Sequence, residues 1–140
     1  MVFIGKVPKG RATGRPTRID TPQIRKALQS IQQDVNTNTR DARRLIGNQS
    51  YLKLIDPSTS LVNVNTGHMR RSYVWRVNGS KQVEILNAAT SKKGFRYPQL
   101  VEKRYGQGTA RTIQRNRGVI VRNTNRLLKR PVAQVLAGEV

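Results

Sequence analysis

Apolar residues recur at helical spacing in the part of the chain that follows residue 20. They lie three, four or seven positions apart, at Ile24, Leu28, Ile31, Val35, Ala42 and Leu45. Thr21 followed by Pro22 is typical of a helix start, because threonine caps the first amides and proline fits the first helical position. Gly47 fits a C-cap. The pattern predicts one long helix over residues 21–47 with its apolar face in the core. A coiled-coil contact is the alternative, but the stripe covers only about three heptads.

An alternating pattern follows the polar, turn-rich segment 48–68. Asn78-Gly79 is a strong hairpin signal between two alternating runs. The alternating apolar positions are Tyr73, Trp75 and Val77 on the first run and Val83 and Ile85 on the second. The pattern predicts a β-hairpin over residues 71–87 whose Tyr73, Trp75 and Val77 side chains enter the core.

The C-terminal third of the chain predicts a short helix and then a basic one. The short helix carries Tyr97, Leu100 and Val101 and ends at Gly106. From Thr109 onward, basic residues share one helical face, at Arg111, Arg115, Arg122, Arg126 and Lys129. Apolar or small residues lie roughly opposite, at Ile113, Ile120, Thr124 and Leu127. The pattern predicts an amphipathic helix that Gly118 weakens and that ends near Pro131. A strand starting at Gly118 is the alternative, and the apolar tail 132–140 is expected to be peripheral.

These elements together predict an α+β fold: a long N-terminal helix packed on a small antiparallel sheet, with a C-terminal helix. Residues 21–137 are expected to form its single domain. Residues 1–20 have the composition of an extended basic arm without its own core, with Met1 to Ile4 able to pair as a short strand. The basic residues of this arm are Lys6, Lys9, Arg11, Arg15 and Arg18.

The charge balance says more about partners than about the fold. The 140 residues include 27 Lys and Arg but only 7 Asp and Glu, which gives a net charge of +20. Nucleic acid, an acidic protein surface and an anionic membrane are the candidate partners. The N-terminus lacks the apolar stretch of a signal peptide and no segment reaches transmembrane length, so we expect no membrane contact and a cytoplasmic site of synthesis.

The sequence offers little catalytic or metal-binding chemistry. No Cys is present, His68 is the only histidine, and the acidic residues are scattered along the chain. No nucleophile, phosphate-loop or metal-ligand pattern occurs. We therefore predict no enzyme activity, no catalytic or metal-binding residues and no cofactor; a basic nuclease is the weakest alternative. Motifs of sequence-specific nucleic-acid readers are also absent, and aromatic platforms are scarce.

One short motif in the segment that leads into the hairpin resembles a known family. Residues 66–72 read TGHMRRS, which resembles the T-G-x-[LM]-[RK]-x-S motif of small tail-completion, or neck, proteins of long-tailed bacteriophages. The matching positions are Thr66, Gly67, Met69, Arg70 and Ser72. A second, looser segment with similar positions follows the hairpin, at Tyr97, Val101, Glu102, Tyr105 and Gly106. The order of the predicted elements over residues 20–137 is also similar. The chain departs from the family where Lys103-Arg104 follows Glu102, because the family places an aromatic-Gly-Thr there almost at once.

The resemblance implies a structural virion protein that is assembled in the host cytoplasm. Such proteins form a six-fold or twelve-fold ring that joins the capsid portal, or connector, to the tail tube. The expected partners are copies of the chain itself, the neighbouring connector and tail-terminator or tube proteins, and double-stranded DNA in the channel. A basic RNA-binding protein of ribosomal type is the alternative, which the composition alone would favour.

The resemblance also suggests a role for each motif residue. Thr66 and Gly67 would form a turn, Met69 and Tyr97 would enter the core, and Glu102 would pair with a basic residue. Arg70, Arg71 and Arg76 would remain on the surface. There they would either contact a neighbouring subunit or ring, or protect a sheet edge against aggregation. The candidates for contacts with a partner or with DNA are Lys6, Lys9, Arg11, Arg15, Arg18, Arg70, Arg71, Arg111, Arg115, Arg122, Arg126 and Lys129.

Overall fold

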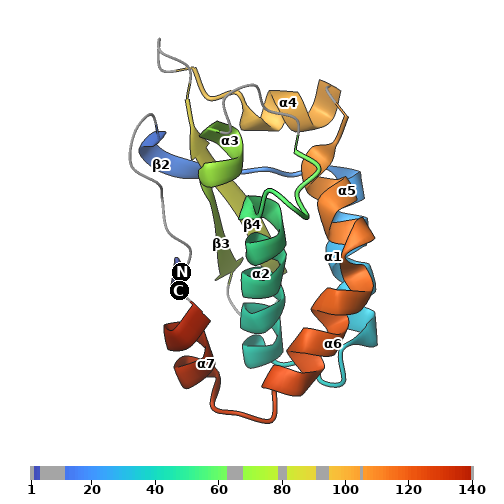
Figure 1. Ribbon diagram of the computed structural model, residues 1–140. Helices are drawn as coiled ribbons and strands as arrows, with labels where there is room; N and C mark the ends of the chain where they lie inside the picture. Colours follow the sequence, from blue (N-terminus) through green and yellow to red (C-terminus); the bar gives the residue numbers. More distant parts are fainter. Residues whose placement is uncertain are drawn as a thin grey trace.

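A four-stranded antiparallel sheet forms one layer of the computed structural model (Figure 1), which describes residues 2–3, 12–62, 68–78, 82–90, 95–104 and 106–139. The strand order is β1-β3-β4-β2. The strands are β1 (Val2–Phe3), β2 (Ala12–Arg18), β3 (Tyr73–Asn78) and β4 (Gln82–Ala89). Helices cover this sheet, so the α+β class that the sequence predicts is confirmed.

The central pair β3–β4 is the predicted hairpin. Trp75 lies opposite Ile85 and Val77 lies opposite Val83, and all four side chains are buried in the core. The sequence predicted this face correctly. The opposite face is also buried at Val74, Leu86 and Ala88. The alternation of residue types therefore does not distinguish a solvent-exposed face from a buried one. Gly79 of the predicted turn lies outside the described residues.

The described part of the predicted N-terminal arm joins this sheet. Strand β1 pairs with β3, and β2 pairs with β4 along the other edge. The register of β2 is irregular between Ala12 and Thr17. Pro16 lies within this stretch, and an edge strand tolerates proline because the missing amide need not enter a ladder. Just after β2, Ile19 is buried in the core.

Seven helices pack with the sheet in the described part of the chain. They are α1 (Pro22–Asp34), α2 (Arg40–Ile55), α3 (His68–Arg71), α4 (Pro98–Arg104), α5 (Gly108–Arg115), α6 (Arg117–Leu127) and α7 (Val132–Glu139). Helix α2 lies against strands β3 and β4 and also contacts α1, α5, α6 and α7. In Figure 1, α2 lies in front of the sheet, and α1 with α5 and α6 forms a further layer on the right. Helix α2 is therefore the central helix of the core.

The single helix predicted over residues 21–47 is wrong, because the structure contains two helices there. Helix α1 begins as predicted, with Thr21 Oγ1 accepting a hydrogen bond from the Ile24 amide at 3.2 Å. It ends at Asp34, where Val35 turns into an extended conformation. Thr39 then caps α2 by accepting a hydrogen bond from the Ala42 amide at 3.1 Å. A second threonine cap thus restarts the helix, while the apolar spacing continues across the break.

Gly47 lies inside α2 and is not a C-cap. A Cβ atom at this position would lie 2.6 Å from Cε3 of the Trp75 indole. Real Cβ atoms do not approach other heavy atoms so closely, so the absent side chain lets the helix backbone pack directly on the buried ring. The helix runs on to Ile55.

The predicted basic helix is also divided. Helices α5 and α6 meet at Asn116, whose side-chain amide donates a hydrogen bond to the Thr112 carbonyl at 2.8 Å. The backbone amide of Asn116 donates to the same carbonyl at 3.1 Å, so the Thr112 oxygen accepts two hydrogen bonds where the two helices meet. Gly118 lies within α6, so the alternative strand is wrong.

The C-terminal tail is not peripheral over the range that the structure describes. It forms helix α7, in which Val132, Val135 and Leu136 are buried in the core. Helix α7 packs on α2.

Candidate functional site

The first motif segment lies in and just after helix α3. Thr66 and Gly67 lie outside the described residues, as do the side chain of His68 and the expected turn. Met69 is buried as predicted, and its carbonyl oxygen accepts a hydrogen bond from the Asn87 side-chain amide at 2.7 Å. Ser72 is buried as well. The described motif positions therefore hold α3 against strand β4.

The arginines near the motif lie in different surroundings. Arg71 is exposed and Arg70 is half-buried. Arg76, expected to remain outside, is only 18% exposed, and its Nε donates to Glu84 Oε1 at 2.5 Å. Arg76 therefore contributes to a contact within the chain.

Glu102, in the second motif segment, pairs with no basic residue among those that the structure describes, although the resemblance suggested such a pair. Its carboxylate is buried and accepts hydrogen bonds from the Thr109 amide at 2.8 Å and the Ala110 amide at 3.1 Å. These are early amides of helix α5, whose own N-cap, Gln107, has a left-handed backbone and makes no side-chain capping bond. Glu102 thus caps α5 from α4, where a carboxylate also interacts favourably with the helix dipole.

The other positions of this segment are partly described. Tyr97 is half-buried and packs against the core. Gly106 has a φ of +89°, in the region that glycine adopts without strain. Helix α4 ends just before it, as predicted. Tyr105 lies outside the described residues.

A buried polar network joins the two motif segments. Tyr73 follows the first segment directly, and its hydroxyl lies 2.6 Å from Thr109 Oγ1. The backbone amide of Thr109 also donates a hydrogen bond to the Glu102 carboxylate. Burial raises the pKa of Tyr73 well above its usual range, which keeps the phenol protonated. All three residues are buried, so this network supports the fold and is not itself a binding site.

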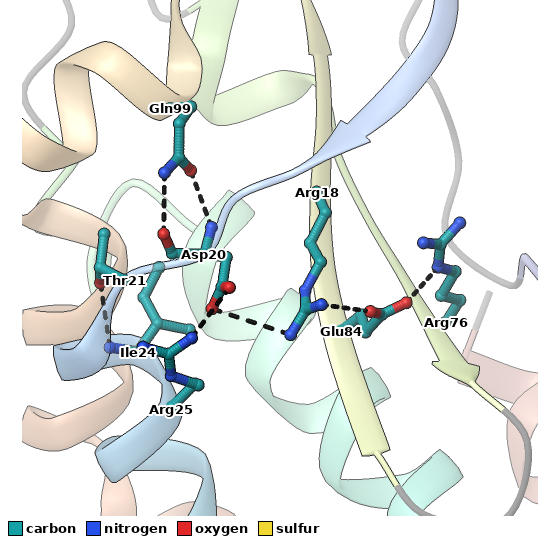
Figure 2. Close-up of polar contacts among 8 residues, drawn as sticks. All are labelled: Arg18, Asp20, Thr21, Ile24, Arg25, Arg76, Glu84 and Gln99. Carbon is teal, nitrogen blue, oxygen red and sulfur yellow. Dashed lines mark hydrogen bonds and ion pairs between the residues drawn. The ribbon is translucent and has the colours of Figure 1, made fainter.

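A second polar group, the Glu84 cluster, comprises Arg18, Asp20, Arg25, Arg76 and Glu84 (Figure 2). Arg18 Nη1 lies 3.0 Å from Glu84 Oε2 while Arg76 binds the other carboxylate oxygen, and the Glu84 side chain is 1% exposed. Arg18 and Arg25 also contact Asp20, at 3.7 and 3.0 Å. The cluster joins the end of β2 and the start of α1 to the β3–β4 pair.

Gln99 of helix α4 holds the same β2–α1 junction. Its side chain donates to the Asp20 carbonyl and accepts from the Asp20 amide, both at 2.7 Å (Figure 2). A pocket of about 280 Å³ lies beside the junction, lined by α1, the end of β2 and the start of β4. The charged side chains at its wall already have partners within the chain, so the pocket offers little unpaired charge to a ligand; they are Arg18, Asp20, Arg25 and Glu84.

Sequence reasoning missed the Glu84 cluster. One signal for it was available, because the hairpin register places Arg76 directly opposite Glu84 and opposite charges favour such pairs. The contribution of Arg18 carried no local signal, since it depends on the pairing of β2 with β4.

The predicted cationic face is present on α5 and α6 and is exposed. We call it the α5–α6 ridge; it consists of Arg111 and Arg115 on α5, Arg122 and Arg126 on α6, and Lys129 just after α6. Ile113, Ile120, Thr124 and Leu127 are buried on the opposite side, as predicted. Arg117 differs from the ridge residues, because its guanidinium forms an ion pair with Asp34 and donates to Ser30 Oγ at 2.6 Å. The other predicted contact residues of the arm, Lys6, Lys9 and Arg11, and the Arg15 side chain lie outside what the structure describes.

The described residues contain no group of three or more His, Cys, Asp or Glu side chains placed to hold a metal ion. In the same part of the chain, no helix is long and apolar enough to cross a membrane. No protein-family model, curated protein or solved structure matches this chain.

Proposed function

We propose that this protein is a structural subunit of a ring in the neck of a long-tailed bacteriophage. The ring would join the capsid portal or connector to the tail tube, with DNA passing through it, and would act by assembly and without catalysis. Its partners would be copies of itself, connector proteins, and tail-terminator or tube proteins. Its location would be the virion, after assembly in the host cytoplasm.

The observation that carries the proposal is the meeting of the two motif segments at the start of α5. Tyr73, next to the first segment, and Glu102, in the second, both engage Thr109. The two segments are far apart in the sequence, and Thr109 of helix α5 connects them through these two hydrogen bonds. This shared partner supports the view that the two segments belong to one local structure, as the resemblance implies.

The distribution of polar surface also supports assembly. Strand β2 is an edge strand, and edge strands and extended segments suit contacts between subunits. The basic residues of the ridge are exposed, which suits a surface that meets an acidic or polyanionic neighbour. The same ridge favours the ribosomal-type alternative, so the test must separate assembly from RNA binding.

The mass of the purified protein in solution, after nuclease treatment and at two salt concentrations, tests the proposal. Native mass spectrometry or light scattering would report a closed ring of defined stoichiometry if subunits assemble by themselves. A monomer should then be mixed with purified capsids that lack tails, and we expect it to bind at the portal vertex. A monomer that ignores the portal vertex but retains RNA until high salt removes it would favour the ribosomal-type alternative.

A further inference from the structure

We infer that the α5–α6 ridge binds the phosphate backbone of double-stranded DNA without reading base sequence. This assigns the DNA contact of the proposed function to one surface. It rests on that function for the choice of duplex DNA over other polyanions, while the surface itself is identified from its charge and surroundings.

The spacing of the ridge residues suits a row of phosphates. Arg111 and Arg115 lie one helical turn apart on α5, and Arg122 and Arg126 lie one turn apart on α6. At 1.5 Å per residue the ridge extends over at most roughly 27 Å, the length of about eight base pairs of DNA. In Figure 1 the two helices follow one another along one side of the molecule. The backbone positions of the ridge residues are therefore spread along this side.

The ridge has no counterions within the described part of the chain. The carboxylates whose side chains are described bind groups other than the five ridge residues, although two of them bind other residues of α5 and α6. Asp20 and Glu84 lie in the Glu84 cluster, Asp34 binds Arg117, Asp41 binds Arg44, Asp56 accepts from Ser58, and Glu102 caps α5. The positive charges of the ridge are therefore left to solvent ions. Phosphates that replace those ions gain the entropy of counterion release, which is the main source of non-specific DNA affinity.

The side chains around the ridge favour a nucleic acid over an acidic protein. Protein interfaces depend on buried aromatic or aliphatic anchors, whereas protein–DNA interfaces are more polar and more positive. Among the described residues only Phe95 is an exposed large hydrophobic residue, and it lies outside α5 and α6. Gln114 and Gly118, also exposed on these helices, add no apolar anchor. Four of the five ridge residues are arginines, whose planar guanidinium binds phosphate through two parallel hydrogen bonds.

The same composition argues against a single-stranded ligand. Proteins that bind single strands stack successive bases on aromatic side chains, and the ridge contains none. Duplex DNA presents regularly spaced phosphates to a row of cations and needs no such platform.

The test compares the double variant R122Q/R126Q with the matched control R96Q/K103Q in the full-length protein. Each variant removes two exposed positive charges. The control residues flank or lie in α4, at the end of the molecule away from the C-terminal end of α6 (Figure 1). Fluorescence anisotropy would follow binding to a labelled duplex DNA of mixed sequence, a second unrelated duplex, an RNA stem-loop and an acidic peptide, between about 50 and 200 mM salt.

We expect equal affinity for the two DNA duplexes, weaker binding to the acidic peptide, and a steep loss of affinity with salt. In R122Q/R126Q the DNA affinity should fall about tenfold at the higher salt concentration, and the slope of log K against log salt should become smaller by about 2, because each lost phosphate contact removes about one unit. The control should change much less. Circular dichroism and thermal unfolding would verify that both variants are folded.

Equal losses in the two double variants would overturn the inference, as would tighter binding to RNA or to the acidic peptide than to duplex DNA. A protein that assembles a ring or joins the portal vertex but does not bind duplex DNA would also overturn it, while the proposed function would stand. A ridge-dependent DNA affinity in a protein that neither assembles nor binds the portal vertex would keep the inference and contradict the proposed function.

Discussion

Arginines occur in two opposite settings in this molecule. In the Glu84 cluster, Arg18 and Arg76 bind the two oxygens of one buried carboxylate, and Arg25 binds Asp20 (Figure 2). On the α5–α6 ridge, Arg111, Arg115, Arg122 and Arg126 are exposed and have no carboxylate partner among the described residues. The same side chain thus joins strands in one place and leaves its charge available in the other. Stability should depend on the first group and polyanion affinity on the second.

The largest effect on stability should come from E84Q. The substitution removes the negative charge that compensates Arg18 and Arg76. The Glu84 side chain that carries this charge is only 1% exposed. Breaking a buried ion pair costs about 3–5 kcal/mol, and partial exposure of both arginines should reduce the loss to about 2–3 kcal/mol. Urea unfolding would measure it. A variant as stable as the wild type would show that the cluster is only an incidental contact, and the distinction between the two settings would be lost.

A smaller loss of stability, about 1–2 kcal/mol, is expected for E102Q. The amide keeps one acceptor oxygen, so one of the two capping bonds to Thr109 and Ala110 is lost together with the charge at the helix N-terminus. Chemical denaturation would give the change, and DNA affinity serves as the control because α5 also carries part of the ridge. A stability loss with unchanged DNA affinity would show that the cap supports the fold without contributing to DNA binding by the ridge. An equal loss of both at temperatures where the variant is folded would show that the cap also positions the ridge.

Y73F should lower the free energy of unfolding by about 1 kcal/mol below pH 10. This loss should become smaller at higher pH. Burial raises the pKa of Tyr73 in the folded protein above the ordinary value of 10.0. The stabilisation from the protonated phenol is therefore complete below pH 10 and is lost as the pH rises beyond it, because the unfolded chain then releases the proton first. The wild type should lose more stability than Y73F when the pH is raised from about 9 to about 11. Parallel curves for the two proteins in denaturant unfolding would contradict the burial of this hydroxyl.

The smallest stability change should come from R122Q/R126Q. Exposed side chains without partners contribute within about 0.5 kcal/mol, and removing like charges should slightly stabilise the fold at low salt. Thermal unfolding at two salt concentrations would measure this, and we expect added salt to stabilise the wild type more than the variant. A clear loss of stability in this variant would show that the ridge arginines also stabilise the fold. The contrast with the Glu84 cluster would then be wrong.

Several elements could be predicted because their signals are local. Thr21-Pro22 begins α1 where expected, since a threonine cap and a proline act within one helical turn. The hairpin follows from alternation on both sides of a turn, and Tyr73, Trp75 and Val77 are buried as that alternation predicts. The exposed basic face of α5 and α6 follows from helical spacing in the same way, although Asn116 divides the helix.

Two of the errors concern residues whose role depends on a distant partner, Gly47 and Glu102. Gly47 reads as a helix end by itself, but Trp75 packs against its backbone and the helix continues. Glu102 lies between Val101 and Lys103 and reads as an ion-pair partner, yet it caps another helix. Apolar spacing continued from Val35 to Ala42 and concealed the break between α1 and α2, because the two helices contribute to the same core.

The sequence by itself determined where α1 and the hairpin begin, that Tyr73, Trp75 and Val77 enter the core, and where positive charge collects. Those properties depend on neighbours within a few positions. Only the tertiary structure decided that β2 joins the sheet, that Arg18 and Arg76 share Glu84, and that no described carboxylate pairs with the ridge. The acidic residues are few, and each described one binds a partner other than a ridge residue. Asp41 and Asp56 have partners within three positions, whereas Asp34 and Glu84 bind arginines on distant segments. Which arginines are paired therefore depends in part on contacts between distant segments, which no local pattern records.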